Sequence, residues 1–595
     1  MSYRIEPTSK TTQDIVIDGW EKGISAGPYQ IFVPSALGPI TQTGMVDLSY
    51  GNIVGIPGEF SVQFPLTAST VTGATMDIPN QVATQIDNSA GGTVTGYFQL
   101  DDKGQVFSAG VSGGAITWTY MATLGSGLSV TGDKGCCYWQ GNVFVWVGSH
   151  IWYSPEGTGY AITATGAISS GATSATLTSN WPLASGTQVV TFSDGETKTV
   201  TFTNASTSIT WTGGLVNTVT AALNILFVDW TATVDPSSLL VAGNQHYAIS
   251  SKVADSMYFC NGNHVGQLQL NLGQTFNPTN PSTYVFQANQ VAIPAYDECT
   301  CLAEINGSVL IGGALNRVYP WDAQNLSGSG VTSLVGLPLF LGDRYVQRIV
   351  VVNANAYIFA GHPVIPTGRG YIYISNGSTI DVFQKMPDNF VTIAGASSTV
   401  QTPYWRFGDA IWHRNQLLFS AVAIGNISGT AISDTGGIWA IDINSNALYR
   451  ANEMTGGNTT LATVINPLDV GTTIPGVGYF CGSSGSMNGP TDTLGTTARI
   501  ISDKIPAGTF LSKGTYEQIE VKLAVPMVTG ESVAITAITD LGSTSIGTMT
   551  STDGVGRVFT PIANQQNLQW IQLQAVLTPT NTNPTFCRLR ELRIR

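Results

Sequence analysis

Short apolar runs bounded by turn residues recur along most of this chain. Examples are "NVFVWV" at 142–147, "SMYFC" at 256–260 and "SVLIGG" at 308–313. Apolar runs of about four to eight residues, bounded by Gly, Asn and Asp, are typical of buried strands. β-branched residues dominate, whereas the helix-favouring Lys, Glu and Ala are scarce or dispersed. The pattern predicts an all-β protein.

The runs belong to a larger unit of a turn, an apolar strand, a second turn and another strand. Copies of this unit occupy 140–154, 254–270, 305–322, 352–377 and 413–450, and 476–489 fits as a last copy. The middle copies are about 45 to 60 residues apart, which is the size of one four-stranded propeller blade with its loops. The first strand of each unit is apolar on both faces, as expected of strands packed between neighbouring sheets. We therefore predict a β-propeller core in which five or six blades are visible.

Two segments interrupt this period, and a third precedes it. Residues 161–230 are rich in Thr and Ser, alternate with a period of two and contain an Asp194-Gly195 hairpin turn, which predicts an inserted β module. Residues 497–595 alternate in the same way and predict a C-terminal β-sandwich-like domain. Residues 1–70 contain many prolines and read as an irregular segment with a docking arm. The expected propeller then consists of 71–160 and 231–496.

The expected arm has apolar side chains but no core of its own. Ile15, Ile17 and Trp20 alternate with acidic residues in "DIVIDGWE" at 14–21. We predict that these three side chains are buried against a neighbouring subunit or an adaptor protein, while the acidic residues face water.

The last residues of the chain are basic in an otherwise acidic protein. With a strand period of two, Arg588 and Arg590 are expected on one face and Arg593 and Arg595 on the other. Such a strand could meet an acidic partner. The alternative is an edge strand that its charges protect from pairing with other chains.

The charge balance restricts the partners of the chain. Lys and Arg number 24 and Asp and Glu 37, so the net charge is 24 − 37 = −13. Tight wrapping of nucleic acid needs clustered Lys and Arg, so this balance argues against it. A wall past which nucleic acid slides without sticking stays compatible, and so does a charge that merely keeps the protein in solution.

Cysteine usage and hydropathy bear on the cellular compartment. The seven cysteines match neither a disulfide scaffold nor zinc-ligand spacing, so we expect free, mostly buried thiols formed in a reducing cytoplasm. The first residues show no apolar signal-peptide core, and no apolar run reaches the roughly 18 residues of a membrane span.

The sequence offers little catalytic chemistry. The five histidines lack metal-site spacing, and nucleophile-elbow and phosphate-loop motifs are absent. Two carboxylates from distant strands could still form a glycosidase pair. The tryptophans of the blade-like units could stack on sugars, but they lie in apolar strands and fit packing between blades better. We expect no enzymatic activity, no cofactor and no metal.

Several long phrases resemble a known family. They include "TTQDIVIDGWEKGISAGPYQ" at 11–30, "PAYDECTCLAEINGSVLIGGALNRVYPWD" at 294–322 and "FCRLRELRIR" at 586–595. These phrases resemble the tail nozzle or stabilization proteins (tail tubular protein B-like) of short-tailed bacteriophages. The resemblance covers most of the chain apart from 161–230.

The resemblance implies a structural protein of the virion tail, made in the host cytoplasm. It implies a propeller-based nozzle, six copies in a ring below an adaptor ring and beside tail fibres or spikes, through which genomic DNA leaves without tight binding. The family implies no catalytic residue. Two alternatives stay open: a tail adhesin that binds the host surface, and a propeller glycosidase acting on surface polysaccharide.

Overall fold

A computed structural model describes the chain in separate stretches. Before residue 97 it describes five strands, and from there to residue 595 it describes most of the chain. Its gaps of nine residues or more after residue 97 are 125–133, 231–239, 324–332, 388–403, 453–463, 468–478 and 507–515. The described part is built from strands and two 3₁₀ turns, η3 (Pro281–Thr283) and η4 (Ser551–Asp553), and contains no α-helix. The predicted all-β class is confirmed.

The described strands include seven four-stranded antiparallel units, which we number as blades in chain order. Blade 1 contains β5 (Pro79–Ala83), β6 (Tyr97–Asp101), β7 (Gln105–Ser112) and β8 (Ala115–Thr123). Blade 2 contains β9 (Lys134–Trp139), β10 (Asn142–Val147), β11 (His150–Pro155) and β17 (Ala222–Asp229). Blade 3 contains β18 (Ala248–Ser250), β19 (Ser256–Asn261), β20 (His264–Leu270) and β21 (Tyr284–Ala292), with β25 (Ser333–Leu334) added in parallel.

The remaining blades follow the same order. Blade 4 contains β22 (Cys299–Ile305), β23 (Ser308–Gly313), β24 (Arg317–Trp321) and β26 (Leu339–Phe340). Blade 5 contains β27 (Tyr345–Val352), β28 (Asn355–Gly361), β29 (Tyr371–Ser375) and β30 (Ile380–Lys385). Blade 6 contains β31 (Tyr404–His413), β32 (Gln416–Ile424), β35 (Gly437–Asp442) and β36 (Ala447–Asn452), and β33 (Asn426–Ile427) and β34 (Thr430–Ala431) form a small hairpin beside it. Blade 7 contains β37 (Val464–Pro467), β38 (Tyr479–Ser483), β39 (Ser486–Leu494) and β4 (Gly58–Phe64).

The blades close into a ring. The first strand of each blade contacts the first strand of the next, from β5 through β9, β18, β22, β27 and β31 to β37, and β37 contacts β5 again. The last blade is completed by β4, which precedes all the others in the sequence and pairs with β39. The chain is thus a β-propeller whose ends are tied together by strand pairing. Blade 1 is absent from the copies found in the sequence. Its glycine-rich segment "SAGVSGGAI" at 108–116 is typical of turns, but 108–112 belong to β7 and 115–116 to β8.

Large side chains fill the spaces between the blades. Trp146 of blade 2 lies 5.2 Å from Phe259 of blade 3 between ring centroids, and Tyr258 of blade 3 lies 5.3 Å from Trp321 of blade 4. Trp139, Trp146, Trp152, Trp321, Trp405 and Trp439 are all buried. Their role is therefore packing rather than sugar stacking.

The Thr/Ser-rich segment emerges between the third and fourth strands of blade 2. It contains β12 (Tyr160–Thr163), β13 (Ser174–Thr176), β14 (Gly186–Phe192), β15 (Thr197–Phe202) and β16 (Ser208–Trp211). One end of β17 pairs with β11 of the blade and the rest pairs with β12 and β14 of the module. The predicted hairpin turn is present, because the backbone N–H of Glu196 donates to Asp194 Oδ1 at 2.9 Å.

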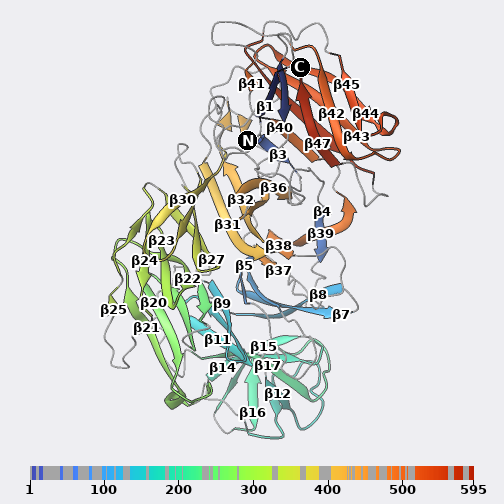
Figure 1. Cartoon of the computed structure of the whole chain (residues 1–595). Helices are drawn as coiled ribbons and strands as arrows, with labels where there is room; N and C mark the ends of the chain where they lie inside the picture. Colours follow the sequence, from blue (N-terminus) through green and yellow to red (C-terminus); the bar gives the residue numbers. More distant parts are fainter. Residues whose placement is uncertain are drawn as a thin grey trace.

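Both ends of the chain form a β-sandwich beside the propeller (Figure 1). One sheet contains β1 (Tyr3–Pro7), β2 (Gln13–Ile17), β47 (Arg588–Ile594), β42 (Ile519–Val525) and β45 (Gly556–Phe559). The other contains β3 (Ile40–Gly44), β40 (Ala498–Ser502), β46 (Trp570–Thr578), β43 (Ser532–Thr539) and β44 (Gly542–Thr550), and β41 (Ile505–Pro506) pairs with β46. The described strands of the expected arm therefore belong to two domains of their own chain.

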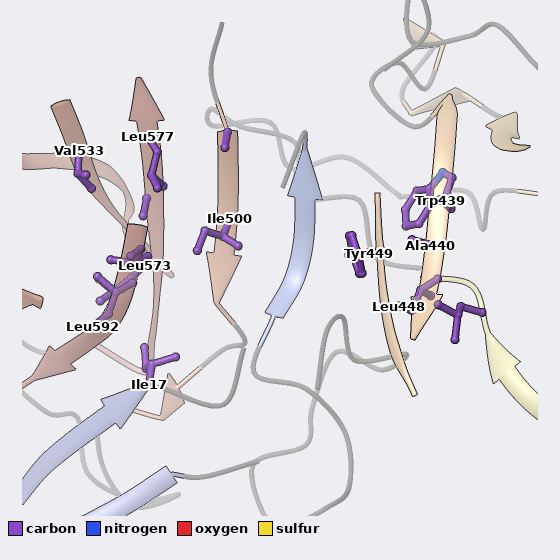
Figure 2. Close-up of a cluster of buried hydrophobic side chains, with 14 of the residues drawn as sticks. Ile17, Trp439, Ala440, Leu448, Tyr449, Ile500, Val533, Leu573, Leu577 and Leu592 are labelled. Atoms are coloured by element: carbon purple, nitrogen blue, oxygen red, sulfur yellow. The ribbon is translucent and has the colours of Figure 1, made fainter. Parts of the chain in front are cut away.

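The sandwich and the propeller meet at blade 6. Strand β3 contacts β36, and Leu448 and Tyr449 of β36 belong to the same buried cluster as Ile500 of the sandwich. Figure 2 shows these side chains on either side of an N-terminal strand, with Ile17 and Leu592 deeper in the sandwich. The two domains thus share one continuous apolar core.

Candidate binding surface on blades 4 and 5

A tight turn at the start of blade 4 is fixed by a buried carboxylate. The N–H of Asp297 donates to the carbonyl oxygen of Pro294 at 2.9 Å, which closes the turn that follows β21. The Asp297 carboxylate accepts from the Tyr319 hydroxyl at 2.9 Å, the Leu315 N–H at 3.0 Å and the Glu298 N–H at 2.9 Å. Burial raises the pKa of Tyr319 to about 12, so this hydroxyl keeps its proton and donates at neutral pH. Asp297 therefore locks the turn against the loop between β23 and β24.

This turn places an aromatic ring beside an arginine. The guanidinium carbon of Arg317, at the start of β24, lies 5.0 Å from the ring centroid of Tyr296 and 5.3 Å from that of Phe340. Both distances are within the roughly 6 Å over which a cation is attracted to a ring face. Arg317 also donates a hydrogen bond to the Tyr296 hydroxyl, and Arg317 and Phe340 are direct cross-strand partners between β24 and β26.

The group is open to solvent although its members are large and partly apolar. Tyr296 is 63% exposed, Phe340 59% and the nearby Leu337 88%. Scattered apolar residues on a surface are ordinary, but large ones beside each other mark an interaction site.

A second set of the same composition lies on blade 5. The guanidinium carbon of Arg344 is 4.8 Å from the ring centroid of Tyr371, and Lys385 Nζ is 5.7 Å from it. The connection between the blades joins the two sets, because the Leu341 N–H donates to Asn316 O at 2.9 Å and Tyr373 donates to Leu341 O at 3.0 Å. Arg344 itself is buried. We call the remaining residues of the two sets, Tyr296, Arg317, Leu337, Phe340, Tyr371 and Lys385, the aromatic–cationic surface.

The electrostatics of this surface favour an acidic or π-rich ligand. Among the described residues, neither Arg317 nor Lys385 has a carboxylate within ion-pair distance. A hydrogen bond with Tyr319 raises the pKa of Arg317 further, so its charge is permanent. Cations held over ring faces can bind carboxylates while the rings provide apolar contact.

Charged groups also meet between the inner strands, but in a buried setting. Arg348 of β27 forms an ion pair with Asp409 of β31, and its guanidinium carbon lies 4.2 Å from the ring centroid of Tyr247. Burial opposes the charge of Arg348, but the ion pair with Asp409 outweighs it and raises the pKa of Arg348. Burial also raises the pKa of the neighbouring Cys301 thiol to about 11. This cluster ties neighbouring blades together, and its side chains are mostly buried, with 15% of Arg348 and 9% of Asp409 exposed.

The predicted arm residues fall on this chain's own sandwich. Strand β2 pairs with β47, so that Ile15 lies opposite Ile594 and Ile17 opposite Leu592. The Ile17 side chain is 0% exposed and buried in the sandwich core, so an intramolecular partner occupies it. Trp20 lies outside the described residues. The interface role of Ile15 and Trp20 stays a prediction.

The C-terminal arginines share one face, which differs from the expected arrangement. Opposite β42, the register shifts by one residue near Arg590, and Leu589, Leu592 and Ile594 are the buried positions. This bulge turns Arg593 to the same outer face as Arg588 and Arg590. Strand β47 pairs on both sides, with β2 and β42, so the edge-strand alternative is wrong.

These arginines already have partners within the chain. Arg593 lies 3.1 Å from Glu591 and 3.7 Å from Glu520, and Arg595 lies 3.8 Å from Glu520. Lys522 joins the same network through Glu591 at 2.9 Å. A role in binding an acidic partner stays a prediction for all four arginines.

The sequence did not reveal the aromatic–cationic surface. Tyr296, Arg317 and Phe340 come from three segments, and only the register between β24 and β26 brings the last two together. The segment "PAYDECTC" at 294–301 contains Tyr296 next to two acidic residues, Asp297 and Glu298. The available signal was its turn, in which a large aromatic residue follows Pro-Ala.

The described part of the chain also gives two negative findings. No group of three or more His, Cys, Asp and Glu residues there is arranged to hold a metal ion. No described helix is long and apolar enough to cross a membrane. Five cysteines, at 136, 137, 260, 299 and 301, are free and buried.

Comparison with known proteins gives distant structural likenesses. No protein-family model and no curated protein sequence matches the chain. Among solved structures it is similar to "YCF48 bound to D1 peptide", with a TM-score of 0.36 and 8% identity, over 73% of this chain and 97% of that one. It is also similar to "Phage phi92 endosialidase", with a TM-score of 0.27 and 12% identity over 62% and 64% of the two chains. A third likeness is an exo-beta-1,3-galactanase from Phanerochaete chrysosporium, with a TM-score of 0.25 and 8% identity over 90% and 99%.

These likenesses correct one expectation from the sequence. The expectation that the chain has no enzymatic activity is contradicted, because an endosialidase and a galactanase are among its structural neighbours. At such low TM-scores, however, the likenesses assign no activity in its place. The chain is an all-β propeller protein, and its function has to be argued from its own residues.

Proposed function

We propose that this chain is a structural subunit of the tail of a short-tailed bacteriophage, forming a ring-shaped nozzle through which DNA leaves. The observation that carries the proposal is where the family-like phrases lie in the fold. They fall on β22, β23 and β24 of blade 4 and on β2 and β47 of the sandwich. The Thr/Ser-rich module, which the resemblance leaves out, is an insertion into blade 2.

The architecture suits a tail subunit that must resist mechanical force while DNA passes. The propeller is closed by β4 and the sandwich by β1, β2 and β3, so both ends of the chain are held by strand pairing. Separating such strands requires breaking several backbone hydrogen bonds together. The net charge of −13 further supports a wall that DNA passes without binding.

The test is the position and copy number of this chain in an assembled particle. A particle that carries a tagged copy of the chain should show six tags around the tail axis. Particles that lack the chain should fail to deliver their DNA into the host cell, even if they bind its surface. A trimeric fibre position for the tag would contradict the proposal. So would particles that deliver their DNA normally without the chain.

A second candidate, a host-surface adhesin, is favoured by the construction of the inserted module. Val190, Phe202 and Trp211 of the module belong to the same buried cluster as Trp146 and Phe259 of blades 2 and 3, and its outer strand β13 exposes Ser174 and Thr176. The module is inserted between β11 and β17, so it can carry a binding face outside the ring of blades. A variant in which a short Gly-Ser linker replaces residues 164–221 distinguishes the nozzle function from the adhesin function.

The two candidates predict different defects in this deletion variant. A nozzle whose module is only decoration should still assemble, adsorb to cells and release DNA. An adhesin should still assemble but lose adsorption to the host. Release of reducing sugar from host polysaccharide by the full chain would instead identify a glycosidase, and a loss of that release in the deletion variant would place the activity in the module.

A further inference from the structure

We propose that the aromatic–cationic surface is the contact through which a second copy of this chain docks, side by side, into a head-to-tail ring. This inference rests on the proposed nozzle function and names the residues that would build its ring. It uses Tyr296, Arg317 and Phe340 as the centre of the contact, with Lys385 at its rim.

The composition of this surface is that of a protein interface. Tyr, Phe and Arg are enriched in interfaces, and Tyr and Arg dominate the residues that carry most binding energy. Here Tyr296 and Phe340 are both more than half exposed and flank one arginine. Leu337, at 88% exposed, extends the apolar area further.

The contact is also held in place before any partner arrives. Arg317 is positioned by two ring faces and by its hydrogen bond to Tyr296, and the turn carrying Tyr296 is locked by Asp297. Side chains that are already ordered lose little conformational entropy on binding, which favours association.

The charge of the aromatic–cationic surface indicates which partner binds to it. Arg317 and Lys385 have no carboxylate partner among the described residues, so a partner surface should be acidic. A second copy is compatible with this requirement, because each copy carries a net charge of −13.

Charge also selects the symmetry. A two-fold axis through the surface would place Arg317 opposite the Arg317 of the other copy, which is repulsive. A heterologous contact instead joins this surface to a different, acidic face of the next copy, and contacts of that kind form a ring when the rotation between neighbouring copies closes.

The experiment combines cross-linking with a count of copies per particle. A photo-reactive benzophenone amino acid replaces Phe340 in one sample and Leu272 in another; Leu272 is a fully exposed leucine on blade 3 and serves as the matched control. In assembled particles, position 340 should give a product of twice the chain mass containing only this chain, and position 272 should not.

The second arm tests the same contact by substitution. The variants Arg317→Glu and Phe340→Ser should associate about 30-fold more weakly, as expected for a central interface residue, while Leu272→Ser should not change association. Each variant is first shown to unfold at the wild-type temperature, so that a folding defect is not read as lost assembly.

The outcomes separate this inference from the proposed function. Rings that persist in both variants, or cross-links from position 340 to another protein, overturn the docking inference and leave the nozzle in place. If wild-type particles contain no ring of this chain, the proposed function fails and the inference falls with it.

Discussion

The propeller and the sandwich are both all-β, yet they are assembled from the chain in opposite ways. In blade 5 the strands β27, β28, β29 and β30 pair in sequence order, each with the next. In the sandwich, β2 pairs with β47, at the other end of the chain. Local pairing repeats as a sequence unit from blade to blade, whereas the strand alternation of the sandwich does not tell which distant strands pair.

The N-terminal strands connect the two regions. Strands β1, β2 and β3 complete the sandwich, and β4 completes blade 7 of the propeller. The two domains therefore depend on one short segment. When a substitution destabilises one domain, the loss of protection from hydrogen exchange in the other domain shows how far the destabilisation extends. The following predictions use this dependence.

The largest effect is expected in the propeller, at the buried ion pair between Arg348 and Asp409. Replacing Asp409 by Ala leaves a buried guanidinium without its carboxylate, which typically costs about 3–5 kcal/mol. Hydrogen exchange followed by mass spectrometry should show faster exchange in β27 and β31, with β42 and β47 of the sandwich much less affected.

The exposed Asp381 on β30 provides the control for this variant. Its replacement by Ala should change stability by less than about 0.5 kcal/mol, because exposed side chains outside special contacts contribute little. Equal protection of β27 in Asp409→Ala and in Asp381→Ala would show that the ion pair does not hold the blades together.

A smaller effect, confined to the sandwich, is expected from Ile17→Ala. The side chain is fully buried between the sheets, and truncation of such a residue costs about 2–5 kcal/mol because it leaves a cavity. Exchange should rise in β2, β47 and β42, while β22 and β27 of the propeller stay protected. The matched variant Val558→Ala, at a half-exposed position of the same sheet, should change little.

The same variant tests the arm interpretation. If Ile17→Ala left the sandwich protected but weakened contacts between copies, Ile17 would act at an interface as the sequence predicted. Its burial beside Leu592 in Figure 2 favours the intramolecular role.

The blades were predictable from sequence because their apolar runs repeat. The runs at 142–147, 256–260 and 308–313 correspond to β10, β19 and β23. Strand β4 was not predictable, because its partner β39 lies more than 400 residues away and prolines at 57 and 65 flank it. Prolines next to a strand resemble those of an irregular segment.

The candidate surface was predictable only in part. The turn at Pro294 could be read from the sequence, but the closeness of Arg317 and Phe340 depends on β26, a strand of two residues after a long connection. A β-bulge also makes a prediction from sequence periodicity fail. In β47 one extra residue places two of the arginines on the opposite face from the one that a period of two predicts.

The smallest effects are expected from pH, and they have opposite signs in the two regions. A hydrogen bond to Asp229, at 2.9 Å, raises the pKa of His150 above its usual 6.5 at the junction of blade 2 and its module. This contact is therefore fully stabilising below about pH 6.5 and is lost as the pH rises through the folded pKa. In the sandwich, burial opposes the charge of Glu591, but Lys522 and Arg593 outweigh it and hold its pKa below the usual 4.5.

The Glu591 contribution is present above about pH 4.5 and is lost as the pH falls through the lowered pKa. Both contacts are partly exposed, so each should contribute less than about 1 kcal/mol. Raising the pH from 6 to 8 should therefore lower the protection factors, which are corrected for the intrinsic pH dependence of amide exchange, in β11 and β17 but not in β47. Lowering the pH from 5 to 3 should lower the protection factors of β47 through Glu591. The variants His150→Gln and Glu591→Gln should each flatten one of these two responses and leave the other unchanged. If both variants flattened the same response, the propeller and the sandwich would not be stabilised independently. The difference between the locally paired propeller and the sandwich built from both chain ends would then have no effect on stability.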